Sequence, residues 1–77
     1  MAISEELRKL VDPNNECCCE HCLSNKCKEW ASSKGYHIYS HNKGCHIHYN
    51  IASFKADSEP EAIFKACQWI LDNKDKQ

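Results

Sequence analysis

The sequence predicts an α+β domain, in which helices flank a small three-stranded antiparallel sheet and a cysteine-rich loop binds a metal ion. Three observations predict this class. Apolar residues recur at helical spacing near both ends of the chain, apolar and polar side chains alternate over residues 36–51, and five of the seven cysteines fall within residues 17–27. We expect a single domain over residues 1–77, because a chain this short buries too little surface for two cores.

The first predicted element is a leading helix within residues 1–12. Ser4 can cap its N-terminus, and the proline and asparagines of residues 13–15 end it, since these residue types favour turns. The apolar residues that share one face of this helix are Ile3, Leu7, Leu10 and Val11.

The cysteine-rich loop at residues 16–27 is predicted to hold a zinc ion. Cys19 and Cys22 have the C-x2-C spacing that lets two thiolates face one ion, and Cys17 and Cys27 extend it to C-x-C-x2-C-x4-C. We expect Ser24 to cap a second helix that carries Cys27 in its first turn, where the helix dipole favours a thiolate. The predicted ligands of Zn²⁺ are Cys17, Cys19, Cys22 and Cys27.

Alternative ligand sets keep Cys19 and Cys22 and replace the other two. Cys18 can take the place of Cys17, or residues of the later hairpin can complete a split site, which needs a bulge because residues 45 and 48 of a regular strand point to opposite faces. The candidate replacements are Cys18, Cys45, His46 and His48. An iron–sulfur cluster suits the same thiolates.

Disulfides are the less favoured use of the cysteines. Their number is odd, and three consecutive cysteines cannot easily all reach acceptable partners. The first six residues also lack a basic start followed by an apolar core, so we expect a cytoplasmic protein with reduced thiols.

A β-hairpin is predicted after the second helix, which Gly35 ends in the left-handed conformation. Residues 36–41 and 45–51 alternate in polarity around a turn at residues 42–44. A register with Ile38 opposite Ile47 or Tyr49 gathers the apolar side chains on one face and the histidines on the other. Phe54 is expected at the centre of a third strand.

A long C-terminal helix is predicted to pack on this sheet. Ser58 and Glu61 form a capping box, and Pro60 suits the first turn. Trp30 and Trp69 are expected to be packing residues. As an alternative, helical spacing places Phe64 and Trp69 off the buried stripe, where they would mark a partner-binding surface. The predicted stripe consists of Ala62, Ile63, Ala66, Cys67, Ile70 and Leu71.

Residues 54–66, with the sequence Phe-Lys-Ala-Asp-Ser-Glu-Pro-Glu-Ala-Ile-Phe-Lys-Ala, follow two predicted strands. This stretch resembles the small phage-encoded domains called the phage ABA sandwich, over about half the chain. The resemblance implies a phage origin and the order of strands and helix. The cysteine-rich segment departs from that family's pattern, and the family has no activity or site residues to carry over.

The composition favours a binding role over catalysis. The chain has no glycine-rich phosphate loop and no evident acid pair, and no apolar run approaches the roughly 18 residues that cross a bilayer. Ten basic and eleven acidic residues give a formal net charge of -1, which makes long-range attraction to nucleic acid weak.

We therefore expect a small zinc-stabilised module that binds a protein partner, such as a phage accessory or anti-defence protein that blocks its target. One alternative is a zinc-finger-like nucleic-acid binder that uses Lys26, Lys28 and Lys34 beside the metal loop. The other is a thiol–disulfide redox protein that uses Cys19 and Cys22.

Overall fold

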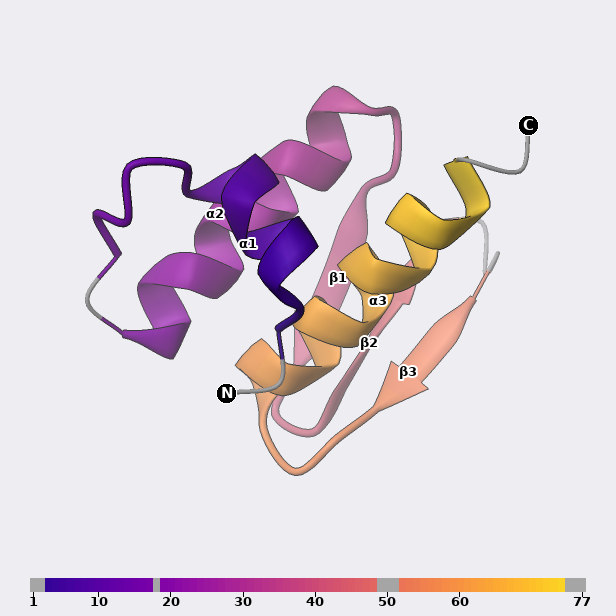
Figure 1. The fold of residues 1–77 in the computed structure, drawn as a ribbon. Coiled ribbons are helices and arrows are strands. Elements are labelled where there is room, and N and C mark those ends of the chain that lie inside the picture. The colour runs from indigo at the N-terminus through magenta and orange to yellow at the C-terminus, as the bar shows by residue number, and fades with distance from the viewer. Residues whose placement is uncertain (1–2, 18, 49–51, 75–77) are drawn as a thin grey trace.

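The structure, a computed structural model, describes residues 3–17, 19–48 and 52–74. It has three helices and a three-stranded antiparallel sheet, which confirms the α+β class (Figure 1). The elements in chain order are α1 (Glu5–Val11), α2 (Glu20–Ser33), β1 (Ile38–His41), β2 (Gly44–Ile47), β3 (Ser53–Lys55) and α3 (Glu59–Lys74).

The sheet has the strand order β1-β2-β3, and its register follows the hydrophobic pattern. Ile38 pairs with Ile47, as one of the two predicted registers requires, and Tyr39 pairs with His46. Side chains of successive residues alternate between the two faces of a strand, so this register gathers the isoleucines on one face and the histidine on the other. The predicted extension of the second strand over residues 49–51 lies outside the described residues.

Gly44 allows the three strands to approach closely beside the β1–β2 turn. A Cβ atom at this position would lie 2.8 Å from the carbonyl oxygen of Phe54 and 2.9 Å from the His41 ring. Both distances are shorter than van der Waals contact, and the first involves a backbone atom that cannot easily move. A side chain at position 44 would therefore separate β2 from β3.

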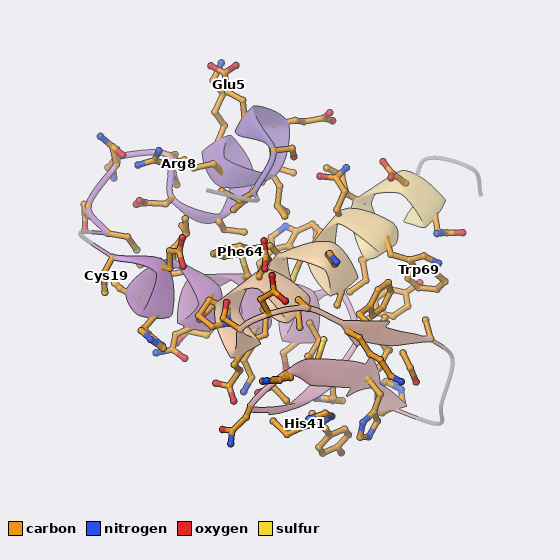
Figure 2. The ribbon with its side chains drawn as sticks, turned by 90° about the horizontal axis from the view of Figure 1, so that it is seen from below. Glu5, Arg8, Cys19, His41, Phe64 and Trp69 are labelled. Carbon is orange, nitrogen blue, oxygen red and sulfur yellow. The ribbon has the colours of Figure 1, made fainter. Side chains whose placement is uncertain are left out.

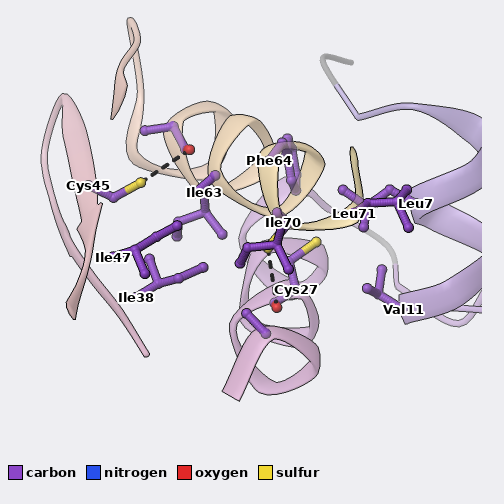
Figure 3. Close-up of a cluster of buried hydrophobic side chains, with 14 of the residues drawn as sticks. Leu7, Val11, Cys27, Ile38, Cys45, Ile47, Ile63, Phe64, Ile70 and Leu71 are labelled. Atoms are coloured by element: carbon purple, nitrogen blue, oxygen red, sulfur yellow. Dashed lines mark hydrogen bonds between the residues drawn. The ribbon is translucent and has the colours of Figure 1, made fainter. Parts of the chain in front are cut away.

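The core lies between the sheet and the helices. α3 crosses one face of the sheet with α2 beside it, and α1 packs over both helices on the side away from the sheet (Figures 1 and 2). In Figure 3, Ile38 and Ile47 of the sheet face Ile63 and Ile70 of α3. The other face of the sheet is not covered by any described helix.

Cys67 belongs to this core, as predicted from its place on the apolar stripe, and Cys45 belongs to it as well. Cys45 is 2% exposed and its thiol donates to the carbonyl oxygen of Ala62, while Cys67 is fully buried and its thiol donates to the carbonyl oxygen of Cys27. Burial raises the pKa of the Cys45 thiol to about 11. Both side chains therefore behave as neutral packing groups.

Trp69 packs against the core, as expected, and the alternative that Phe64 and Trp69 form an exposed surface is wrong. Phe64 is 1% exposed, because α1 and α2 cover the side of α3 that turns away from the sheet. One turn further along this side, Gln68 accepts a hydrogen bond from Ser4, the N-cap residue of α1. Trp69 is half-buried and packs edge-on against Tyr36 and Phe54.

Candidate functional site

The cysteine-rich segment is more helical than the sequence predicts. α2 begins at Glu20 with Cys19 as its N-cap residue, so the expectation that Ser24 caps this helix is wrong. Ser24 is buried one turn inside, where its hydroxyl donates to the carbonyl oxygen of His21. The early start of α2 is explained by the burial of Leu23. Packing of this side chain against the core stabilises a helical turn that comes before Ser24, the residue whose type favours a cap.

Two predicted ligands meet where this loop enters α2. The sulfur atoms of Cys17 and Cys22 lie 3.1 Å apart, and both side chains are half-buried. A disulfide bond is about 2.0 Å long. Two thiolates on one tetrahedral zinc ion stand about 3.8 Å apart, given Zn–S bonds of about 2.3 Å. The two thiols are thus in contact without being bonded, and a small rotation of either side chain brings them to the spacing of zinc ligands.

The contact between the two sulfur atoms changes the acidity of Cys17. A hydrogen bond with Cys22, partial burial and the nearby Asp12 carboxylate together raise the pKa of the Cys17 thiol to about 12. At neutral pH this group is a thiol rather than a thiolate, which makes it a poor nucleophile. A metal ion that binds here must displace the proton, so binding releases protons to solvent.

Cys19 lies at the surface beside this pair, at the N-terminal end of α2 (Figure 2). An exposed side chain changes rotamer at little cost, so Cys19 can turn toward an ion held by Cys17 and Cys22. The positive end of the helix dipole favours anionic ligands at this end of α2. Cys18, the sequence-based alternative to Cys17, lies outside the described residues.

Cys27 lies away from this turn. It is the eighth residue of α2 rather than a member of its first turn, and it is fully buried. Five residues advance a helix by about 7.5 Å and turn it by about 140°, so Cys22 and Cys27 leave α2 in different directions. The interior position of Cys27 follows from the stripe that it forms with Leu23 and Ala31.

The alternative split site is not assembled either. Cys45 points into the core, whereas His46 stacks on Tyr39 at the opposite face of the sheet. His48 lies two residues beyond His46 and accepts a hydrogen bond from the backbone N–H of His37. Over the described ranges, no three histidine, cysteine or acidic side chains are gathered closely enough to hold an ion as they stand.

Asp12 is a structural residue of this site that the sequence analysis missed. Its two carboxylate oxygens accept hydrogen bonds from the backbone N–H groups of Glu16 and Cys17, and its side chain is 4% exposed. Its own backbone N–H donates to the carbonyl oxygen of Arg8 at the end of α1. Asp12 therefore ties the loop that carries Cys17 to α1. The signal was the Asp-Pro pair, since aspartate before a turn often binds the backbone that follows.

Replacing Asp12 with asparagine is expected to destabilise the metal-free protein at neutral pH. The hydrogen bonds from Glu16 and Cys17 hold the pKa of the Asp12 carboxyl below its ordinary value of 3.8. Because the pKa is lower in the folded state, the carboxylate stabilises the fold above that ordinary value, and this contribution is lost as pH falls through the folded-state pKa. Urea unfolding in EDTA, at several pH values from neutral to acidic, measures the effect.

The stability difference between wild type and Asp12→Asn should shrink as the pH falls, because protonation removes the same charge from the wild type. Asp72→Asn serves as the control, since Asp72 is exposed on α3 and has only the Gln68 side chain as its hydrogen-bond partner among the contacts described. If the difference stayed constant down to the acid limit of folding, Asp12 would not act through its charge.

Comparison with known proteins identifies no family for this chain. No family model, no curated protein and no solved structure matches it. The resemblance to the phage ABA sandwich therefore remains a prediction. Among the described residues, no helix is both long enough and apolar enough to span a membrane.

Proposed function

We propose that this protein is a small, non-enzymatic binding domain that carries a structural zinc ion at the start of α2 and contacts its partner through the uncovered face of its sheet. The observation that carries the zinc site is the 3.1 Å contact between the sulfur atoms of Cys17 and Cys22. Zinc supplies a fixed link between the loop and α2. The chain's own residues position the ligands, with Asp12 orienting the backbone of Cys17.

The ligand set that we propose is Cys17, Cys19 and Cys22, with an exposed donor of the same turn, such as His21, or a water molecule in the fourth position. Cys27 is left out because it is fully buried in the core. A metal link at this place would stabilise the loop that precedes α2. Residues 13–16 are all exposed, so apolar packing holds this part of the loop only weakly.

The redox alternative has less support. That alternative uses Cys19 and Cys22, and a thioredoxin-like motif of this spacing follows a strand, whereas the first described strand, β1, comes after α2. The uncovered sheet face supports the binding role more directly. Tyr39 is 55% exposed there, the larger of the two exposed fractions among the described large hydrophobic residues.

Native mass spectrometry of the reduced protein after exposure to zinc tests the metal site. We expect one zinc ion per chain in the wild type and none in Cys22→Ser, because the variant removes one of the two sulfur atoms already in contact. Cys27→Ala is the matched control, since it removes a cysteine of the same helix from the core and should leave the bound zinc in place.

The opposite pattern would refute the proposed ligand set. If Cys22→Ser retained zinc and Cys27→Ala lost it, the ligand would be the interior Cys27 and not Cys22. If the reduced wild type took up no zinc and the oxidised wild type formed an intramolecular disulfide, the two thiols would serve as a Cys17–Cys22 bridge and not as a metal site.

A further inference from the structure

The charges of this chain are segregated in a way that its net charge conceals. None of the eleven acidic residues lies between Glu29 and Asp57. That interval contains all three strands, together with three lysines and four of the five histidines. The acidic residues therefore belong to the helices and to the loops around them. The strands themselves carry only neutral and basic residues, although Glu29 borders the sheet beside β1, and Asp57 and Glu61 border it beside Lys55.

Planar rings form two pairs on the uncovered face of the sheet, which we call the outer face: one joins β1 to β2, and the other lies just beyond the ends of these strands. Tyr39 of β1 stacks on His46 of β2, with ring centroids 5.4 Å apart and planes 25° apart. The rings of His37 and His48 form a second pair, with centroids 5.3 Å apart. Residues two apart on a strand share a face and stand about 6.8 Å apart, so the two pairs form neighbouring rows.

A third row completes the outer face beside the β1–β2 turn. His41 pairs with Gly44, and Gly44 pairs with Lys55, so the row runs across all three strands. The His41 ring lies over the space where Gly44 lacks a side chain, and Figure 2 shows His41 on the side of the sheet away from the helices. Lys43 lies at the same end, because its carbonyl oxygen accepts a hydrogen bond from the N–H of Ala56.

A groove of about 310 Å³ borders the outer face between α2 and β1. Lys28 and Ser32 of α2 line it opposite Tyr39 of β1 and His37, which directly precedes β1, and this places a cation and a hydroxyl group beside the stacked rings. Glu29 lines the α2 side of the same groove. Its carboxylate repels phosphate, so a bound polyanion is expected to follow the β1 side.

From these features we infer that the outer face binds single-stranded nucleic acid, with bases stacked on Tyr39 and His46 and phosphates near Lys43 and Lys55. Unpaired bases stack on aromatic side chains of an open sheet, and this stacking tolerates different base sequences. The row spacing of about 6.8 Å is twice the rise of about 3.4 Å per nucleotide in a duplex strand, which suits an extended strand. This inference rests on the proposed function, because it names the partner of the same face.

Single strands fit this surface better than a duplex. The bases of a duplex are stacked on each other and leave only their edges accessible, so the Tyr39 ring would have no base plane to contact. An acidic protein would pair with the basic groups of the face. Its carboxylates would make no stacking contact with the rings at the centre of the face. The combination of stacked rings with flanking lysines favours nucleic acid.

Fluorescence anisotropy with the chain of 77 residues, in reducing buffer with and without added zinc, tests the inference. The probes are labelled RNA and DNA single strands of roughly eight nucleotides, the matching duplexes, and polyglutamate. Tyr39→Ala should weaken binding to the single strands roughly 5- to 150-fold, the usual effect of removing one stacking ring. Tyr39→Phe should bind within about twofold of the wild type, because it keeps the ring.

Leu10→Ala is the control for surface truncation, since Leu10 is 49% exposed but lies on α1, across the helices from the sheet. It should bind like the wild type. Lys55→Ala should reduce the slope of log affinity against log salt by about 0.7, the value for one phosphate contact with a single strand. Circular dichroism of each variant checks that the fold is intact.

Several outcomes would overturn the inference. Absence of binding to either single strand at about 50 mM salt would do so, as would equal affinity for duplexes and single strands. Binding of polyglutamate that is as tight as that of the oligonucleotides, and unaffected by Tyr39→Ala, would make the partner an acidic protein. That last result would leave the proposed function intact. A preference between the RNA and DNA probes identifies which single strand the face accepts.

Discussion

Replacing Phe64 with alanine is expected to lower the free energy of unfolding by about 3–5 kcal/mol. Phe64 is 1% exposed and lies on the side of α3 that faces α1 and α2, so its removal leaves a cavity between the helices. A chain of 77 residues has a stability of about 4–12 kcal/mol, at about 0.05–0.15 kcal/mol per residue. The variant should therefore lose a large part of its stability, measured by urea unfolding with far-ultraviolet circular dichroism.

Leu10→Ala is again the appropriate comparison, because Leu10 is a large apolar residue that is 49% exposed. We expect its effect on stability to stay within about 0.5 kcal/mol. A loss of less than about 1 kcal/mol for Phe64→Ala would contradict the packing of α1 and α2 over α3, since a ring in an interhelical core cannot be removed at so small a cost.

Removal of zinc is expected to lower the melting temperature of the loaded protein by roughly 15–30 °C. Zinc at about a thousand times its dissociation constant stabilises the folded state by about 4 kcal/mol. Each kcal/mol corresponds to about 4–8 °C in a domain of this size. In the proposed site the metal would join Cys17 to Cys22 across the start of α2, so we expect the loop and the first turn of α2 to loosen first. Differential scanning calorimetry with and without a chelator measures the shift.

The core gives the metal-free protein some stability of its own, because Leu7 of α1 and Ile63 and Phe64 of α3 are buried on elements that do not carry the cysteine turn. A chelator should therefore lower the melting temperature without abolishing the transition. Cys22→Ser should melt near the metal-free wild type and should not respond to the chelator. An unchanged melting temperature in wild type shown to carry zinc would mean that the ion does not support the fold.

The position of the charges bears on the choice of partner. A formal net charge of -1 favours a protein partner over nucleic acid when the chain is treated as a whole. The acid-free interval from residue 30 to residue 56 is visible in the sequence, but its meaning depends on where those residues lie. The fold places the three strands of this interval in one sheet whose outer face is uncovered, so the local charge, rather than the net charge, is what a ligand meets.

Local patterns were sufficient for most of the fold. The period-two alternation determined the strands and the register of Ile38 with Ile47, because a shift of one residue would turn the isoleucines toward solvent. The positive φ of Gly35 after α2 follows in the same way, since only glycine adopts that conformation without strain. Ser4 caps α1 as expected, with its hydroxyl accepting a hydrogen bond from the N–H of Leu7.

The candidate site depended more on tertiary structure. The spacing of Cys17, Cys19 and Cys22 was sufficient to single out this turn, but the role of Cys27 was decided by the burial of its helix face. The start of α2 was decided in the same way, because packing of Leu23 outweighs the local preference for a cap at Ser24.

By itself, the sequence determined what depends on neighbours along the chain: the strands, the hairpin turn, the helix ends at Ser4 and Gly35, and the cysteine-dense segment that enters α2. The tertiary structure alone decided what depends on which elements pack together. It buried Phe64 beneath α1 and α2, placed Cys27 in the core, brought Cys17 to Cys22 and left the sheet with one open face. The physical reason is that burial and contact between distant residues are properties of the packed chain, which a local pattern limits but does not specify.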